Sequence, residues 1–190
     1  MRLFVRCVLT IVLLVWSSGA APATTVIEKN LDALINEADQ VFVGTVTSVR
    51  SDWTDSMHRD IETVVTFGDL LPLAGVDAPT IELRFAGGQV GDLIEHIAGM
   101  PQFTVNDRLV IFAHRDHSAS SLVGFHQGCF RVDGTGENAS VTVPSYERMG
   151  TLSDGRSVVS DAPKTITTIP LPDFLTDIRH RLAQRDGAAQ

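Results

Sequence analysis

Most apolar residues in the middle of the chain alternate with polar ones at the two-residue spacing of β-strands. Residues 41–49 are β-branched, aromatic or small, with no proline and no charge, which predicts a strand with much of both faces buried. Gly44 lies inside this stretch, and a glycine there predicts a bulge or a sharp bend. We expect this strand to be the first of a closed or nearly closed β-sheet.

Further strands are predicted at short intervals after the first one. They cover residues 61–67, 80–85, 108–113, 122–132 and 141–143. The segments between them are polar or are interrupted by glycine and proline, and are predicted to be loops, above all 50–60, 68–75 and 114–121. Short strands with turns and no helix between them are typical of a small barrel or sandwich. We therefore predict a mainly β fold, a small OB-like barrel.

Helical spacing replaces the alternation at both ends of the chain. Thr25 and Glu28 have the spacing of a capping box, and apolar residues then recur at helical intervals up to Ala38, which predicts a helix from Thr25. A second helix is predicted over 172–185, with Asp173 at its N-terminus and arginines in its last turns. The predicted domain is thus a β-barrel flanked by an N-terminal and a C-terminal helix.

Residues 1–23 have the pattern of a secretory signal peptide. Arg2 and Arg6 precede an apolar core, and small residues at 18–23 offer cleavage after Ala20 or Ala23. The apolar core is shorter than the roughly 20 residues needed to span a bilayer. We expect an exported protein, periplasmic or extracellular, whose residues 24–190 form a single domain.

Loss of this leader changes the charge and the cysteine content. The formal net charge of the whole chain is −8; the leader carries two arginines and no acid, so the remainder has a net charge of −10. Nucleic acids and anionic membranes bind basic surfaces, so neither is an expected partner. Cys129 becomes the one cysteine, which excludes an intramolecular disulfide. Its apolar neighbours predict a buried, unreactive thiol rather than a nucleophile.

Several ordered motifs between residues 38 and 131 carry a family resemblance. They are Ala38-Asp39, the strand around Gly44, Trp53, the alternating 61–67, Gly87-Gly88 with Gly91, Gly99-x-Pro101-x-Phe103 and Gln127-Gly128-x-Phe130. This order resembles a group of exported bacterial proteins of uncharacterised function and, more loosely, the netrin-like modules of metalloproteinase inhibitors, which are OB-type barrels. Those inhibitors chelate the protease metal through a cysteine at the mature N-terminus. This chain has no cysteine there, so the resemblance implies the barrel and not that inhibitory mechanism.

Three histidines are the best candidates for a metal site. His114 and His117 lie on one loop and His126 on the strand leaving it, and three imidazoles with a water are a known arrangement for catalytic zinc. The alternative reading is that they are solvated loop histidines, because so short a motif often occurs by chance. Asp116, His117 and Ser118 are consecutive and cannot form a catalytic triad, so we assign no catalytic residue and no cofactor.

Two hypotheses about function follow. The first is an exported, non-enzymatic binding module that contacts a partner, such as a protease or a peptide, through the loops 50–60 and 114–121, with Trp53 and His58 as partner-binding residues. The second is a metal-dependent enzyme that uses His114, His117 and His126. Trp53 can instead be a local lid on the core, since an aromatic residue in a loop marks a binding site only sometimes.

Overall fold

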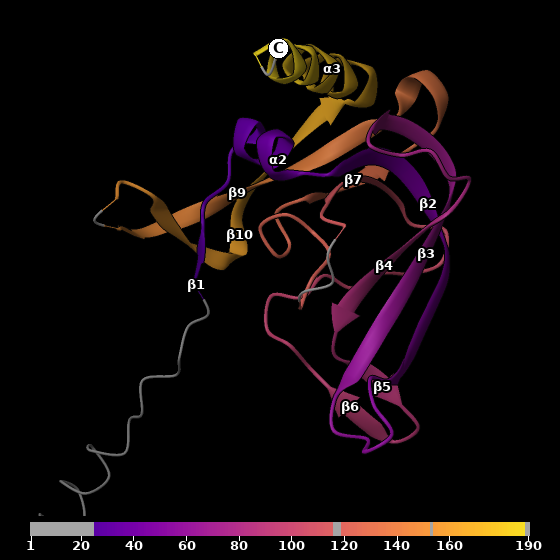
Figure 1. Cartoon of the computed structure of the whole chain (residues 1–190). Helices are drawn as coiled ribbons and strands as arrows, with labels where there is room; N and C mark the ends of the chain where they lie inside the picture. Colours follow the sequence, from indigo (N-terminus) through magenta and orange to yellow (C-terminus); the bar gives the residue numbers. More distant parts are fainter. Residues whose placement is uncertain (1–24, 116–118, 153, 189–190) are drawn as a thin grey trace, which may run out of the picture.

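The computed structural model describes residues 25–115, 119–152 and 154–188 (Figure 1). The predicted leader lies outside these residues. Two α-helices are present in the described part, α2 (Leu31–Glu37) and α3 (Leu171–Ala188), with one 3₁₀ turn, η1 (Gly136–Asn138). The strands are β1 (Thr25–Ile27), β2 (Gln40–Trp53), β3 (Ile61–Ala74), β4 (Ile81–Ala86), β5 (Gly88–Val90), β6 (Leu93–Glu95), β7 (Arg108–Ala113), β8 (Cys129–Asp133), β9 (Ser140–Thr151) and β10 (Ser157–Pro170).

Eight of these strands form one antiparallel sheet in the order β1-β10-β9-β8-β7-β2-β3-β4. β5 and β6 form a separate two-stranded hairpin. The end strands β1 and β4 do not pair with each other, and no sheet of the described residues closes into the predicted barrel. The outer edge of β4 instead meets the segment 119–121, where the backbone N–H of Ala86 donates to Ala119. The prediction of a mainly β fold is confirmed. The sheet of the described residues is open, so the predicted closed barrel is not confirmed.

β2 is the predicted first strand and lies in the interior of the sheet. Its pairing with β3 shifts register between Val43 and Thr45, while its pairing with β7 runs through Gly44 without a break. A bulge is therefore present at this point of the ladder, but its extra residue is on β3, where Asp69 and Leu70 both lie opposite Gly44, and not within β2 as predicted. A Cβ at this position would lie 2.9 Å from Leu70 Cδ2, so the missing side chain also permits close packing.

The two hairpin strands are longer than predicted because pairing overrides local composition. Residues 50–53 were predicted to begin a loop, but they pair in register with 61–64 and end β2 at Trp53. β3 likewise continues through Gly68 and Pro72, where a loop was predicted. Beyond Phe67 only β2 pairs with β3, and a proline is tolerated where one side of a strand is free.

The predicted strand 122–132 is shortened to β8. Residues Gly124 and Phe125 have positive φ angles of 66° and 70°, and the N–H of Gln127 donates to Gly124 O. This tight turn replaces the first half of the expected strand. Gly128 approaches Phe112 so closely that a Cβ there would lie 2.6 Å from the Phe112 carbonyl oxygen.

The N-terminal helix begins later than predicted. Asn30 is its N-cap, with its side chain accepting from Ala33 N at 2.9 Å, whereas Thr25 opens β1 and pairs with Ser160 of β10. The capping box at Thr25 was therefore a wrong prediction. The C-terminal helix is confirmed and extends the predicted 172–185 by a few residues, and it lies across one end of the molecule beside α2 (Figure 1).

The core consists of two clusters on opposite faces of the central strands. Val41 and Val43 of β2 face a cluster under the two helices, and Phe42 and Val46 face a second cluster with β3 and β4. Alternating residues of β7 divide in the same way. The burial of both faces predicted for the first strand is thus confirmed over residues 41–46, all but Thr45 of them buried.

Candidate binding site

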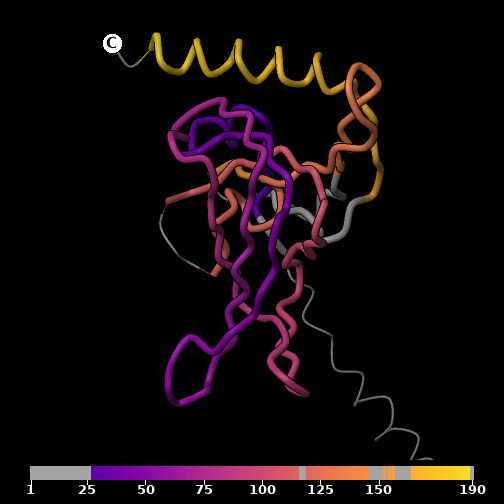
Figure 2. The backbone as a smooth tube through the Cα atoms, turned by 90° about the vertical axis from the view of Figure 1, so that its right-hand side faces the viewer, coloured from indigo at the N-terminus to yellow at the C-terminus, as the bar shows by residue number. Residues whose placement is uncertain are grey.

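A cavity of about 280 Å³ lies at the end of the molecule opposite α3. Here the β2–β3 and β5–β6 hairpins project together (Figure 2). We call it the hairpin cavity; its lining includes Val49, Ser51, Thr63, Phe85, Met100 and Phe103. The lining thus combines hydroxyl groups with apolar and aromatic side chains.

The two hairpins are held together by hydrogen bonds and by a close approach at Gly88 that needs a glycine. The N–H of Gly87 donates to Ile61 O at 2.7 Å, and the N–H of Ile61 donates to a carboxylate oxygen of Glu95 at 2.7 Å. A Cβ on Gly88 would lie 2.3 Å from Thr63 Oγ1 and 2.4 Å from Ser51 Oγ. Any side chain at Gly88 would therefore separate the hairpins and fill the cavity.

A chain of hydrogen bonds fixes the two hydroxyl groups of the cavity. Thr63 Oγ1 donates to the carbonyl oxygen of Gly87 at 2.7 Å, which uses its one hydrogen. At 2.9 Å from Ser51 Oγ, Thr63 Oγ1 must then accept the hydrogen of Ser51. Ser51 Oγ is left with acceptor capacity, so it suits a ligand group that donates a hydrogen bond.

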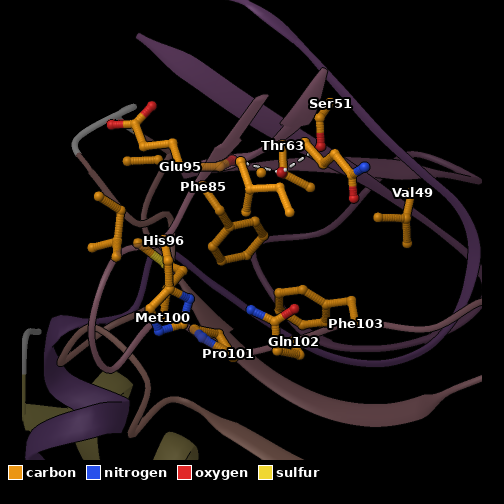
Figure 3. A pocket seen from close by; sticks show the side chains of 16 residues that line it. Val49, Ser51, Thr63, Phe85, Glu95, His96, Met100, Pro101, Gln102 and Phe103 are labelled. Atoms are coloured by element: carbon orange, nitrogen blue, oxygen red, sulfur yellow. Dashed lines mark hydrogen bonds between the residues drawn. The ribbon is translucent and has the colours of Figure 1, made fainter. Parts of the chain in front are cut away.

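The opposite wall of the cavity is aromatic. The ring of Phe103 lies 4.7 Å from that of Phe85, centroid to centroid, and across the cavity from the two hydroxyl groups (Figure 3). Ile94 at the rim has 70% of its surface exposed, and Val49 36%. An exposed apolar rim around a polar floor is typical of a binding site.

Trp53 and His58, the predicted partner-binding residues, are brought together beside this cavity. Their ring centroids are 4.9 Å apart, across the turn 54–60 that joins β2 to β3. Residues 48–53 of β2 pair with β3 without a register break, so Trp53 lies on the same face as Val49 and Ser51.

The turn 54–60 also contains an ion pair. Arg59 Nη2 lies 2.7 Å from Asp55 Oδ2, and the hydrogen bond from the Arg59 guanidinium holds the pKa of Asp55 below its usual value.

The histidines predicted to bind metal are only partly within the described residues. His114 follows β7, and its Nδ1 lies 3.9 Å from Asp39 Oδ2. The N–H of His126 donates to Gly124 O in the turn before β8, and His117 lies outside the described residues. No group of three or more His, Cys, Asp or Glu side chains within 25–115, 119–152 and 154–188 is arranged to hold a metal. The three-histidine site, which needs His117, stays a prediction.

A second cavity, of about 340 Å³, lies between the two helices and the sheet. We call it the helix cavity; its apolar lining includes Leu31, Leu34, Phe130 and Phe174. Charged groups at its rim are paired, because Arg181 bonds both Asp177 and Asp32 at 2.8 and 2.5 Å. The charge of Arg181 at its rim is therefore satisfied within the protein.

The sequence pattern missed the β5–β6 hairpin and the segment 96–103 that complete the hairpin cavity. The one available signal was the cluster of three glycines in 86–91, which was interpreted as a turn. A turn is indeed present at Gly91, with φ at 60°. The close approach at Gly88 depends on strands far away in the sequence and leaves no local pattern.

Comparisons with protein-family models, curated proteins and solved structures found no match to this chain. Neither helix of the described part is long and apolar enough to cross a membrane. The argument for function therefore depends on the geometry of the hairpin cavity.

Proposed function

We propose that this protein is an exported, non-enzymatic binding module that takes a segment of a partner polypeptide at the hairpin cavity. The observation that carries the proposal is the lining of this cavity: a hydroxyl acceptor at Ser51, an aromatic wall at Phe103 and an exposed apolar rim at Ile94. Export is part of the proposal and is supported by the signal-like pattern of residues 1–23.

The chemistry of the cavity favours one kind of side chain. An apolar stem can pack against the rings of Phe85 and Phe103, while a terminal N–H or O–H group donates to Ser51 Oγ. Trp53 and His58 extend the contact beyond the cavity along the same face of β2. A polypeptide can occupy both places at once, with one side chain in the cavity and its neighbours on the rings.

The charge of the chain supports a protein partner over a nucleic acid. The formal net charge is −8, which opposes binding to a polyanion. The loose resemblance of residues 38–131 to netrin-like modules implies a partner such as a co-exported protease. Because the sheet does not close, we propose this likeness only at the level of binding through one end of an OB-like sheet.

A peptide selection on the purified protein tests the proposal. Random peptides displayed on phage are selected on the chain produced without residues 1–23, in which Trp53 is the one tryptophan. Binding of the selected peptides is then measured by the fluorescence of Trp53. We expect a consensus with a donor group on an apolar stem, and a change in Trp53 emission on binding.

Two charged substitutions at the rim provide the matched comparison. The double variant Val49→Asp/Ile94→Asp changes side chains that are already exposed, so we expect the fold to persist and the affinity to fall at least about tenfold, the equivalent of roughly 1.4 kcal/mol. Leu71→Asp, at a position 38% exposed and outside the cavity lining, should bind like the original chain. Selected peptides that bind all three proteins equally, or no consensus at all, would contradict the proposal.

A further inference from the structure

Among the residues that the structure describes, no strand covers one edge of the second half of β10. β9 pairs with β10 along one side, but on the other side β1 covers only residues 158–160. No other strand of the described part pairs with the edge from 165 to 169. Residues 165–168 are all exposed, and Ile166 keeps 61% of its surface in water. This part of β10 lies at the margin of the molecule, and α3 runs away from it (Figure 2).

The ladder with β9 shows which backbone groups point outward. The N–H of Leu171 donates to Ala139 O at 2.8 Å, which continues the register that pairs Ile169 with Val141. In an antiparallel ladder every second residue faces the partner strand, so Thr167 bonds β9. Ile166 and Thr168 therefore direct their N–H and C=O groups to the free side.

We propose that two copies of this chain form a dimer by antiparallel pairing of these β10 edges. With Thr167 of one copy opposite Thr167 of the other, Ile166 lies opposite Thr168 across the two-fold axis. Both residues have outward-facing N–H and C=O groups, so each such pair exchanges both of its hydrogen bonds. The edge is thus complementary to itself, which is the requirement of a two-fold interface.

The residues around this edge limit the pairing to one partner and one register. Pro170 has no N–H to donate, and the register shifts on both sides of Pro163 bend the strand before the edge begins. Lys164 lies opposite Pro170 of the other copy in this register, so the two lysines do not meet. Pairing uses the free edge of both copies, and the assembly closes at two.

The composition of the edge also favours a strand as its occupant. Thr165, Ile166, Thr167, Thr168 and Ile169 are all β-branched, the residue class most frequent in strands. A pairing of this length is small compared with the interface of a permanent dimer. We therefore expect a reversible equilibrium that depends on protein concentration.

Sedimentation velocity over a series of protein concentrations tests the dimer. Thr168→Pro removes an outward N–H that the ladder with β9 does not use, so it should leave the β9 pairing in place and weaken dimerisation at least tenfold. Thr168→Val keeps this N–H and the β-branched shape, and should dimerise like the original chain. Ile166→Lys puts a lysine of each copy opposite Thr168, so that the two new positive charges are diagonal neighbours across the two-fold axis. It should also shift the equilibrium to monomer, without relying on a proline.

A disulfide tests the register independently of the affinity. Residues opposite each other in a pair without hydrogen bonds have Cα atoms about 4.5 Å apart, within the range that a disulfide spans. Thr167→Cys should therefore form a covalent dimer on mild oxidation. Thr165→Cys lies opposite Ile169 of the other copy and should not.

Three results would overturn the dimer. They are a chain that stays monomeric at every concentration, a dimer that persists in both Thr168→Pro and Ile166→Lys, and cross-linking that is equal at positions 165 and 167. The dimer goes beyond the proposed function: Val49→Asp/Ile94→Asp should leave it unchanged.

Discussion

The two cavities of this protein have similar volumes but differ in how their walls are held. Around the helix cavity, Gln127 accepts a hydrogen bond from Lys29 N and donates one to Ile27 O, both at 2.8 Å, and Arg185 donates to Ile35 O at 2.9 Å. These contacts join residues about a hundred or more positions apart in the chain. Around the hairpin cavity, apolar side chains such as Ile94 face water beside polar ones such as Gln89 and Gln102.

The difference indicates different roles for the two spaces. The helix cavity is a consequence of packing two helices onto one face of the sheet, and its polar groups are used within the protein. The hairpin cavity keeps an unused acceptor at Ser51 and an exposed rim at Ile94. Substitutions at the helix cavity should therefore change stability, and those at the hairpin cavity should change binding.

The largest expected effect comes from truncating an aromatic wall of each cavity. Phe174 is 6% exposed and packs on Phe130 with ring centroids 5.3 Å apart, so Phe174→Ala should lower the free energy of unfolding by about 3–5 kcal/mol. Phe103 is less buried, and Phe103→Ala should cost about 1–2 kcal/mol because less apolar surface is lost from the interior. Urea unfolding of both variants measures this, and equal losses would remove the distinction between the walls.

A smaller effect is expected from the polar groups of each cavity. Gln127→Ala leaves the N–H of Lys29 and the carbonyl of Ile27 without their partner, and should cost about 1–3 kcal/mol of stability with little change in peptide binding. Ser51→Ala removes the proposed ligand acceptor while Thr63 keeps its bond to Gly87. We expect about 1 kcal/mol or less of lost stability but weaker peptide binding. Chemical denaturation measures the loss of stability, and Trp53 fluorescence measures the loss of peptide binding. A Gln127→Ala variant that loses binding, or a Ser51→Ala variant that loses mainly stability, would contradict the comparison of the two cavities.

The contribution to pH-dependent stability should also differ between Asp107, just before β7, and Asp55, in the turn 54–60. Burial by itself raises the pKa of Asp107, but its pairing with Arg131 and a hydrogen bond from Thr104 N keep the pKa below the usual 3.8. A carboxyl whose pKa is lowered in the folded state stabilises the fold above its ordinary pKa, and this contribution is lost as the pH falls through the folded value.

Unfolding free energies measured from pH 7 down to about pH 2 test this sign, the lower limit lying below the ordinary pKa of an aspartate. Asp107→Asn should be less stable than the original chain at pH 7 and should lose less stability below about pH 4. Asp55→Asn serves as the control. Its carboxyl also has a lowered pKa because of Arg59, but it is exposed to solvent, so solvent screening should leave the acid dependence almost unchanged.

The last prediction concerns the reactivity of the Cys129 thiol, and it involves no change in the stability of the fold. Burial raises the pKa of its thiol to about 12, so the thiolate that would react is almost absent at pH 8. A thiol reagent should leave the folded chain produced without residues 1–23 unmodified, and should react with Cys129 once that chain is unfolded in guanidinium. Rapid modification of the folded protein would contradict this prediction, because Cys129 is half-buried and would then be accessible without unfolding.

Several features of the fold could be read from local composition because they depend on few neighbours. The central strands and the C-terminal helix follow from side-chain type and spacing. The β9–β10 hairpin is similar: the dipeptide Asp154-Gly155 is typical of a turn, and a hydrogen bond from Leu152 N to Arg156 O closes it. In each case the signal lies within a few residues.

The errors lie where pairing between distant segments overrode a local signal. Thr25 has a capping pattern, yet pairing with Ser160 makes it a strand. Pro72 and Gly68 are typical of a loop, yet β2 holds them in β3. Residues 123–128 read as a strand, but the positive φ angles at Gly124 and Phe125 turn the chain back, and no local rule required this.

The sequence alone determined that the fold is mainly β and that the chain is acidic, and it places Trp53 and His58 only five positions apart. Whether these residues border a cavity was decided by tertiary structure, since the hairpins meet only because Gly88 admits Ser51 and Thr63 at contact distance. Tertiary structure also decided that the sheet stays open. Side-chain periodicity specifies which face of a strand is buried, but the partner at each edge depends on contacts between segments far apart in the chain.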